Sequence, residues 1–247
     1  MRAGRGKGIF LAIVACSCGA PAATGPFSRL AVETAARKAQ SRSAKNEDLH
    51  GNVPDEADVA LVIIDMINDF EFPQGDVLFK QALPVAEKVA RLKERARQAG
   101  LPVIYANDNF GKWRSDFQHQ VRHCLEDGVR GEPIVRLIQP GEEDYLVVKP
   151  KHSAFYATPL DLLLAYLKVT TLMLVGVAGD LCVLFTAGDA FIRDYHLLVP
   201  SDCIASTSAD ENRLSLEQMQ RKLDADIRPS DALDFKEIKR AAAERAK

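Results

Sequence analysis

The sequence predicts an α/β protein, folded as a three-layer α/β/α sandwich around a mostly parallel central sheet with Rossmann-like topology. Short apolar runs rich in β-branched residues alternate with longer segments that have helical periodicity. The apolar runs are continuous and do not alternate with polar residues, as expected for parallel strands buried on both faces. The chain has 247 residues, which is enough for one domain with a full hydrophobic core.

Five segments have the composition of buried strands. They are residues 59–64, 103–106, 145–148, 171–177 and 197–200. The first, Val59–Ile64, contains only apolar residues, four of them Val or Ile, and we expect it to lie inside the sheet. Pro200 predicts the end of the last strand, because proline cannot donate to a strand ladder.

Four longer segments carry helix signals, at residues 84–98, 158–167, 180–195 and 210–225. Gly100 and Pro102 predict the end of the first helix. Thr158, Pro159 and Asp161 give the second helix a capping residue, a proline at its first position and an acid in its first turn. The segment 107–141 is long and mixed, and we expect one short helix within it.

Composition excludes some classes of partner. The net charge is −2, from 32 basic and 34 acidic residues, and no basic stripe with interleaved aromatic residues is present. Nucleic acid is therefore not an expected partner. The five cysteines are an odd number at irregular spacing, which argues against a disulfide framework and favours a reducing, cytoplasmic location.

We expect residues 58–225 to form the compact domain, followed by a charged and helical C-terminal tail at 226–247. Residues 1–57 are expected to be a leader and linker, with a possible exposed helix at Ala31–Lys45. Basic residues before the apolar run 9–16 resemble an export signal or a lipoprotein-like segment, so export is the alternative to a cytoplasmic location. Two other interpretations of this N-terminal segment are a disordered arm and a start codon assigned too early. The run is too short to span a membrane, and we expect no stable membrane association.

Three chemically reactive residues are expected to meet at one edge of the sheet. Asp65 ends the first predicted strand, Lys149 ends the third, and Cys182 opens the helix after the fourth. The carboxyl ends of parallel strands share one edge, where active sites of such sheets lie. The helix N-terminus and the lysine cation would favour the thiolate of Cys182, and the Asp65 carboxylate could take and later deliver a proton. Backbone N–H groups around Ala178 and Cys182 could hold an oxyanion.

The segments 65–70 (DMINDF), 149–155 (KPKHSAF) and 176–183 (GVAGDLCV) resemble the isochorismatase-like cysteine hydrolases, a superfamily that includes nicotinamidases, other small-amide hydrolases and isochorismatases. The resemblance covers about residues 58–225. It implies Asp65 as general acid and base, Lys149 as the charge-stabilising residue and Cys182 as nucleophile. It also implies a cis peptide bond between Val177 and Ala178, which would aim the Ala178 amide into the oxyanion hole. Gly179 departs from the family, which usually has a threonine there.

The loops at the same edge supply candidate substrate-binding residues, while packing is the alternative for each. These candidates are Asn107, Asp108, Phe110, Trp113 and Phe155. His119 and His123 are four residues apart and could share a helix face as metal ligands. Nicotinamidases have an Asp-x-His metal site after the second strand, and residues 106–110 (ANDNF) contain no histidine. We therefore expect no metal and no other cofactor. Cys124 and Cys203 lack reactive neighbours and are predicted to be structural.

The predicted function is hydrolysis of a small molecule, most simply cleavage of an amide C–N bond through a thioester on Cys182. Vinyl-ether hydrolysis of the isochorismatase type is one alternative and would need no thioester. A catalytically silent oligomeric binding or scaffold protein is another, against which the complete Asp65, Lys149 and Cys182 set argues. We also expect a homo-oligomer.

Overall fold

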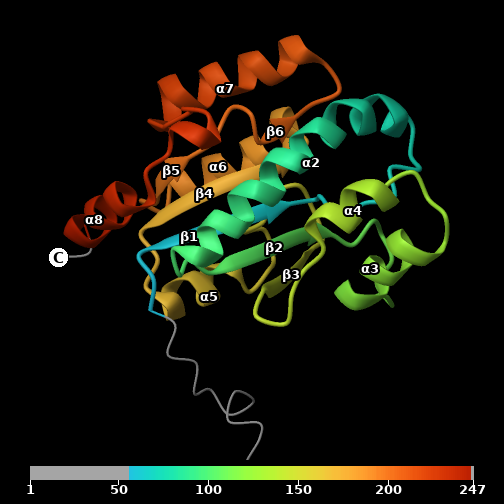
Figure 1. The fold of residues 1–247 in the computed structure, drawn as a ribbon, viewed down its shortest axis with the longest axis horizontal. Coiled ribbons are helices and arrows are strands. Elements are labelled where there is room, and N and C mark those ends of the chain that lie inside the picture. Colours follow the sequence, from blue (N-terminus) through green and yellow to red (C-terminus); the bar gives the residue numbers. More distant parts are fainter. Residues whose placement is uncertain (1–55, 246–247) are drawn as a thin grey trace, which may run out of the picture. The chain divides into compact units, whose positions relative to one another are not determined.

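The computed structural model describes residues 56–245, and the fold of this part of the chain is shown in Figure 1. The expectations for a leader, an export signal and a helix at Ala31–Lys45 lie outside these residues. Between residues 56 and 245, no helix combines the length and the apolar character needed to cross a bilayer.

The centre of the protein is a parallel sheet of six strands. They are β1 (Val59–Ile64), β2 (Val103–Asp108), β3 (Tyr145–Lys149), β4 (Thr171–Val177), β5 (His196–Leu198) and β6 (Ile204–Ala205). The order is β3-β2-β1-β4-β5, with β6 also paired to β4, and every pair is parallel. The predicted α/β/α class with a mostly parallel sheet is confirmed.

The register of β1 explains its continuous apolar sequence. All six of its residues are buried. Leu61 and Ile63 belong to the hydrophobic core on one face of the sheet, and Val62 and Ile64 belong to the core on the other. Because successive side chains point to opposite faces and both faces are covered, no position in this strand suits a polar residue.

One face of the sheet is covered by α2 (Gly75–Gln98), α3 (Phe117–Glu126), α4 (Glu132–Ile138) and α8 (Phe235–Arg245). In Figure 1, α2 crosses in front of the strands. The prediction that this helix begins at Pro84 was wrong, since it begins nine residues earlier. Leu78 and Ala82 are buried upstream of the proline, so packing extends the helix despite the usual penalty for an internal proline. The segment 107–141 holds two helices where one was expected.

The other face is covered by α5 (Leu160–Leu167), α6 (Leu184–Phe191) and α7 (Ala209–Leu223). Helix α5 begins after Thr158, whose hydroxyl accepts a hydrogen bond from the Leu160 amide at 3.2 Å. The helix predicted at 180–195 is a π-helical turn (Gly179–Val183) that leads into α6 and ends sooner than expected. Helix α7 lies where it was predicted, with Ser208 as its cap.

Residues 226–245 pack against the domain, although they were expected to form a charged tail outside it. Strand β5 ends at Leu198, which forms a parallel bridge with Asp226. After a 3-10 turn (Ser230–Ala232), α8 buries Ile238 and Ala242 in the same core as α2. Residues 226–245 therefore contribute apolar side chains to the domain core. Strand β6 was not predicted, because two residues are too few to show a pattern.

Candidate active site

Asp65, Lys149 and Cys182 come together at the carboxyl edge of the sheet. Asp65 directly follows β1, Lys149 is the last residue of β3, and Cys182 lies in the π-helical turn after β4. The Lys149 ammonium nitrogen lies 2.8 Å from Asp65 Oδ2 and 3.7 Å from Cys182 Sγ. The parallel arrangement thus brings together three residues that are up to 117 positions apart (182 − 65).

The turn that carries Cys182 is formed by close backbone contacts. Gly176, the next-to-last residue of β4, has φ 120°, and a Cβ at this position would lie 2.1 Å from the Ile64 carbonyl oxygen. The peptide bond between Val177 and Ala178, at the end of β4, is cis. The amides of Leu181 and Val183 both donate to the Ala178 carbonyl at 3.1 Å, which closes the turn around the cysteine.

Gly179, the departure from the family pattern, lies in a crowded place. A Cβ there would approach Asn212 Oδ1 to 2.5 Å. Ser206 Oγ accepts a hydrogen bond from the Asp180 amide at 3.1 Å and lies 3.0 Å from Asn212 Oδ1. These two side chains occupy the space beside the turn and support it. Neither Ser206 nor Asn212 lies in a recognised motif, so the sequence alone predicted no role for them.

Lys149 is the electrostatic centre of the site. Its side chain is fully buried between Asp65 and Asp108, whose Oδ2 lies 3.4 Å from Nζ, and it donates to the Lys151 carbonyl at 3.3 Å. Burial opposes the charge, but attraction from Asp65, Cys182 and Asp108 outweighs it and raises the pKa of Lys149. The lysine is therefore a cation in the resting protein.

The thiol of Cys182 differs from the sequence-based expectation of a favoured thiolate. Burial, followed by the nearby Asp65 carboxylate, raises the pKa of Cys182 above its usual range, although Lys149 lowers it. Burial also raises the pKa of Asp65, which hydrogen-bonds with the thiol. Loss of solvation and the neighbouring Asp65 outweigh the effect of the lysine, so the resting cysteine is a thiol.

The backbone of Ala178 is directed at the reactive sulfur. Its N–H hydrogen-bonds with the Cys182 sulfur. This amide belongs to the pair expected to form an oxyanion hole. Thr186 Oγ1 donates to the Cys182 carbonyl at 2.7 Å and accepts from the Ala154 amide at 3.0 Å. Thr186 thereby ties the turn after β4 to the loop after β3.

Asn107 and Asp108 support the site from β2. The Asn107 side chain is buried; its oxygen accepts from the Ile67 amide at 3.1 Å, and its NH₂ group donates to the Ile67 carbonyl at 2.8 Å. The Asp108 amide donates to Asp65 Oδ1 at 2.7 Å. Asn107 therefore joins β2 to the loop after β1, while the Asp108 backbone orients Asp65.

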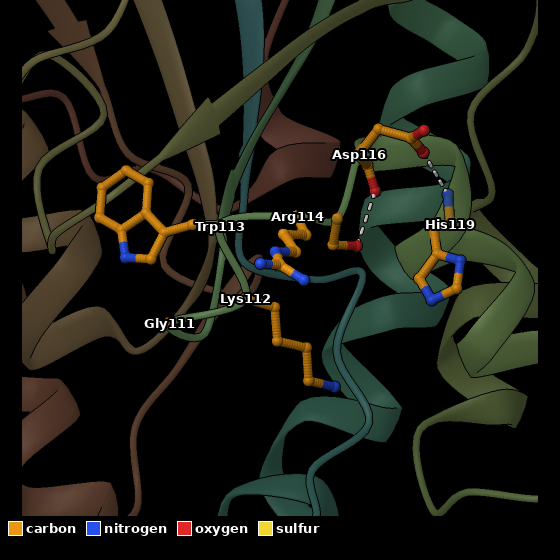
Figure 2. A pocket seen from close by; sticks show the side chains of 7 residues that line it. Gly111, Lys112, Trp113, Arg114, Asp116 and His119 are labelled. Carbon is orange, nitrogen blue, oxygen red and sulfur yellow. Dashed lines mark hydrogen bonds between the residues drawn. The ribbon is translucent and has the colours of Figure 1, made fainter.

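The three aromatic candidates lie in different surroundings. Phe155 is buried in the core beside α5 and α6, with its ring against Tyr195 and the Arg193 guanidinium 4.7 Å from its centroid. Phe110 and Trp113 lie in the loop after β2, and Trp113 is 77% exposed. Figure 2 shows the Trp113 side chain on the opposite side of this loop from Lys112 and His119. Residues 111–116 and His119 line an open pocket of about 560 Å³ there.

His119 and His123 both line a small cavity of about 50 Å³, which Asp69 and Cys124 also border. His119 borders the pocket of Figure 2, whereas His123 lies between Asp69 at 3.3 Å and Asp127 at 2.7 Å. In residues 56–245, no group of three or more His, Cys, Asp or Glu side chains could hold a metal ion. The expected lack of a metal remains a prediction.

The other two cysteines of the described chain lie apart from the site. Cys124 and Cys203 are buried and free. Burial raises the pKa of each thiol to about 12. Their surroundings agree with structural roles.

His152 is a neighbour of the sulfur that the sequence analysis did not assign. Its Nδ1 lies 3.9 Å from Cys182 Sγ, and its ring centroid is 5.9 Å from that of Phe185. Both rings are exposed, while Asp65 and Lys149 are buried. The signal was present in the segment 149–155, where the histidine follows Lys149 by three residues, but only the fold brings it to the cysteine.

Comparison with known proteins gives a consistent set of relatives. Residues 59–228 match the family model of the isochorismatase domain. The uncharacterized isochorismatase family protein YaaI of Bacillus subtilis (strain 168) is 44% identical over 171 residues, covering 69% of this chain and 93% of that protein.

Two further relatives have named activities. Ureidoacrylate amidohydrolase RutB of Methylobacterium radiotolerans is 29% identical over 174 residues, covering 60% of this chain and 67% of that protein. The crystal structure of N-carbamoylsarcosine amidase from Thermoplasma acidophilum is similar with a TM-score of 0.55 and 30% identity. The similarity covers 71% of this chain and 98% of that one.

Proposed function

The chain belongs to the isochorismatase family of hydrolases, and on that premise we propose that it cleaves an amide C–N bond of a small molecule through a thioester on Cys182. The observation that carries the proposal is the position of the Lys149 ammonium, 2.8 Å from Asp65 and 3.7 Å from the Cys182 sulfur. A carboxylate, a cation and a thiol in contact are the parts that nucleophilic acyl transfer requires.

In the first half of the reaction, Cys182 attacks the carbonyl carbon while its proton passes to the Asp65 carboxylate. The raised pKa of Asp65 suits it to accept this proton. The carbonyl oxygen becomes an oxyanion and is stabilised by the amides of Ala178 and Cys182. When the intermediate collapses, the C–N bond breaks, Asp65 returns the proton to the departing amine, and a thioester remains.

In the second half, the thioester is hydrolysed. Asp65, again a carboxylate, takes a proton from a water molecule that attacks the thioester carbon. The C–S bond then breaks, the acid product leaves and Cys182 recovers a proton. Throughout the cycle Lys149 stays charged and balances the negative charge that moves between Asp65 and the sulfur. Ammonium or amine and a carboxylic acid are the products.

We prefer amide cleavage to vinyl-ether hydrolysis and to a silent scaffold because two relatives are named for the cleavage of amide-type bonds. Ureidoacrylate amidohydrolase and N-carbamoylsarcosine amidase both act on amide-type C–N bonds by their names. Vinyl-ether hydrolysis would use Asp65 as an acid without a covalent intermediate. A silent scaffold would gain nothing from a buried ion pair at 2.8 Å beside a cysteine, since such pairs add little net stability.

The test is a hydrolysis screen of the purified full chain against small amides, ureides and isochorismate, with intact-mass measurement of quenched reactions. We expect release of ammonia or amine from at least one amide or ureide, together with an acyl adduct on the peptide that contains Cys182. Turnover of isochorismate alone, without an adduct, would contradict the proposal and favour the vinyl-ether reaction. No turnover of any compound, combined with an unreactive Cys182, would favour the silent protein.

A further inference from the structure

The mouth of the site contains one titratable side chain in contact with the reactive sulfur. His152 presents Nδ1 at 3.9 Å from Cys182 Sγ, from an exposed position in the loop after β3. In a near-attack geometry the scissile carbon lies about 3–3.5 Å from the attacking sulfur. The substrate carbon must therefore approach the sulfur more closely than the imidazole does, and its substituents come beside the His152 ring.

The three substituents of the scissile carbon can be assigned by elimination. The carbonyl oxygen faces the amides of Ala178 and Cys182, as the proposed oxyanion hole requires. The departing nitrogen faces Asp65, which must deliver a proton to it. The remaining substituent, the first atom of the acyl group, points away from these buried groups and toward the open side, where His152 and Phe185 lie.

The charges around the site favour an anionic acyl group on this side. On the interior side, Asp65 and Asp108 both lie against Lys149, so the lysine's charge is already balanced there. Lys151, which precedes His152 in the chain, is exposed, and neither a hydrogen bond nor an ion pair engages its ammonium group within the part of the chain that the structure describes. An imidazole N–H and a free lysine on consecutive residues suit a carboxylate.

We propose that His152 is a specificity-determining residue that binds a carboxylate carried by the substrate's acyl group close to the scissile carbonyl, with Phe185 packed against the other side of the ring. This inference rests on the proposed function, because the elimination uses its oxyanion hole and leaving-group side. It names the substrate class as small amides or ureides whose acyl group carries a free carboxylate, in preference to neutral amides.

The test uses two alkylating reagents of similar size, which place either a carboxylate or a neutral amide beside the Cys182 sulfur and His152. Iodoacetate and iodoacetamide both react when the Cys182 thiolate displaces iodide, which leaves a carboxylate or a neutral amide one carbon from the sulfur. The rate at the Cys182 peptide is followed by mass spectrometry in the full-length folded protein. The ratio of the iodoacetate rate to the iodoacetamide rate reports stabilisation of the anion and cancels changes in thiol reactivity.

We expect His152→Leu to lower this ratio about 1.5- to fivefold, the range for a solvent-exposed ion pair. His152→Asn keeps an N–H donor near the Nδ1 position and should retain part of the preference. His196→Leu is the matched control, because the exposed His196 begins β5 at the opposite edge of the sheet, and its ratio should equal that of the wild type. Circular dichroism melting confirms that each variant is folded.

An unchanged ratio in His152→Leu, or an equal fall in His196→Leu, would overturn the inference. Neither result would affect the proposed function, which is tested by turnover and by the acyl adduct. Conversely, amide hydrolysis by a Cys182→Ala protein would overturn the proposed function, and with it the elimination on which the role of His152 rests. Once a substrate is found, His152→Leu should raise KM for a carboxylate-bearing amide and leave kcat nearly unchanged.

Discussion

The opposed effects of Lys149 and Asp65 on the thiol give a quantitative prediction. Two unit charges 3.7 Å apart interact by about 4 kcal/mol at an effective dielectric constant of about 20, which corresponds to about three pKa units. In Lys149→Met the buried Asp65 carboxylate also loses its cation and takes up a proton more readily, which offsets part of the loss. We therefore expect the pKa of Cys182 to rise by about one to three units.

The assay is the rate of iodoacetamide alkylation at Cys182 between pH 6 and pH 10. Below the pKa of the thiol the rate is proportional to the thiolate fraction, so Lys149→Met should react about ten- to a thousandfold more slowly at pH 8. Asp65→Asn should react faster than the wild type, because the anion that raises the pKa of Cys182 is gone. The same Asp65→Asn protein should have lost turnover, since nothing remains to carry the proton.

Stability of the variants must be controlled, because removal of one partner from a buried ion pair costs about 3–5 kcal/mol. Cys203 is the internal marker, since it is buried and reacts only when the domain opens. The double variant Lys149→Met with Asp65→Asn removes the pair together, and its alkylation rate should lie between those of the single variants. A Lys149→Met protein that is folded and alkylates at the wild-type rate, or an Asp65→Asn protein that alkylates more slowly, would refute the electrostatic account.

Three further predictions concern metal dependence, the backbone and pH. Dialysis against a chelator should leave full activity, and elemental analysis should find no stoichiometric zinc, iron or manganese; activity restored by one metal would contradict this. Gly176→Ala should destabilise the domain by at least about 2 kcal/mol in urea unfolding, because its Cβ would lie 2.1 Å from the Ile64 oxygen, whereas Gly188→Ala, with nothing within 4 Å, should be neutral or stabilising. The hydrogen bond from Arg228 lowers the pKa of Asp226, so its contribution to stability is present above pH 3.8 and is lost as the pH falls through the lower folded-state pKa. Asp226→Asn should therefore be less stable than the wild type at pH 7, and unfolding at pH 3 should show a smaller difference; an equal difference at both pH values would be contrary evidence.

The strands were predicted well because each carries its own local signal. The bounds of β1 and β4 match the prediction, since both are continuous apolar runs buried on two faces. The start of α2 was missed because a proline inside a helix is a strong local stop signal, and only the buried Leu78 and Ala82 outweigh it. Strand β6 pairs through two residues, and no local pattern distinguishes so short a strand.

The sequence predicted those residues of the site that lie at the carboxyl ends of strands. Asp65, Lys149 and Cys182 each follow from the rule that carboxyl ends of parallel strands share an edge. The protonation state of the thiol did not follow, because it depends on burial and on the distance to Asp65. His152 was missed for a similar reason, since its contact with Cys182 joins the loop after β3 to the turn after β4, and only the fold brings these two segments together.

The Cys182→Ala variant tests the central claim most directly. Its rate is measured on the best amide or ureide from the screen, beside wild-type protein and with circular dichroism melting as the control for folding. We predict a melting temperature close to that of the wild type and hydrolysis reduced to the uncatalysed rate, because the sulfur that forms the thioester has been removed. A folded Cys182→Ala protein that retains a large share of wild-type turnover would contradict the account.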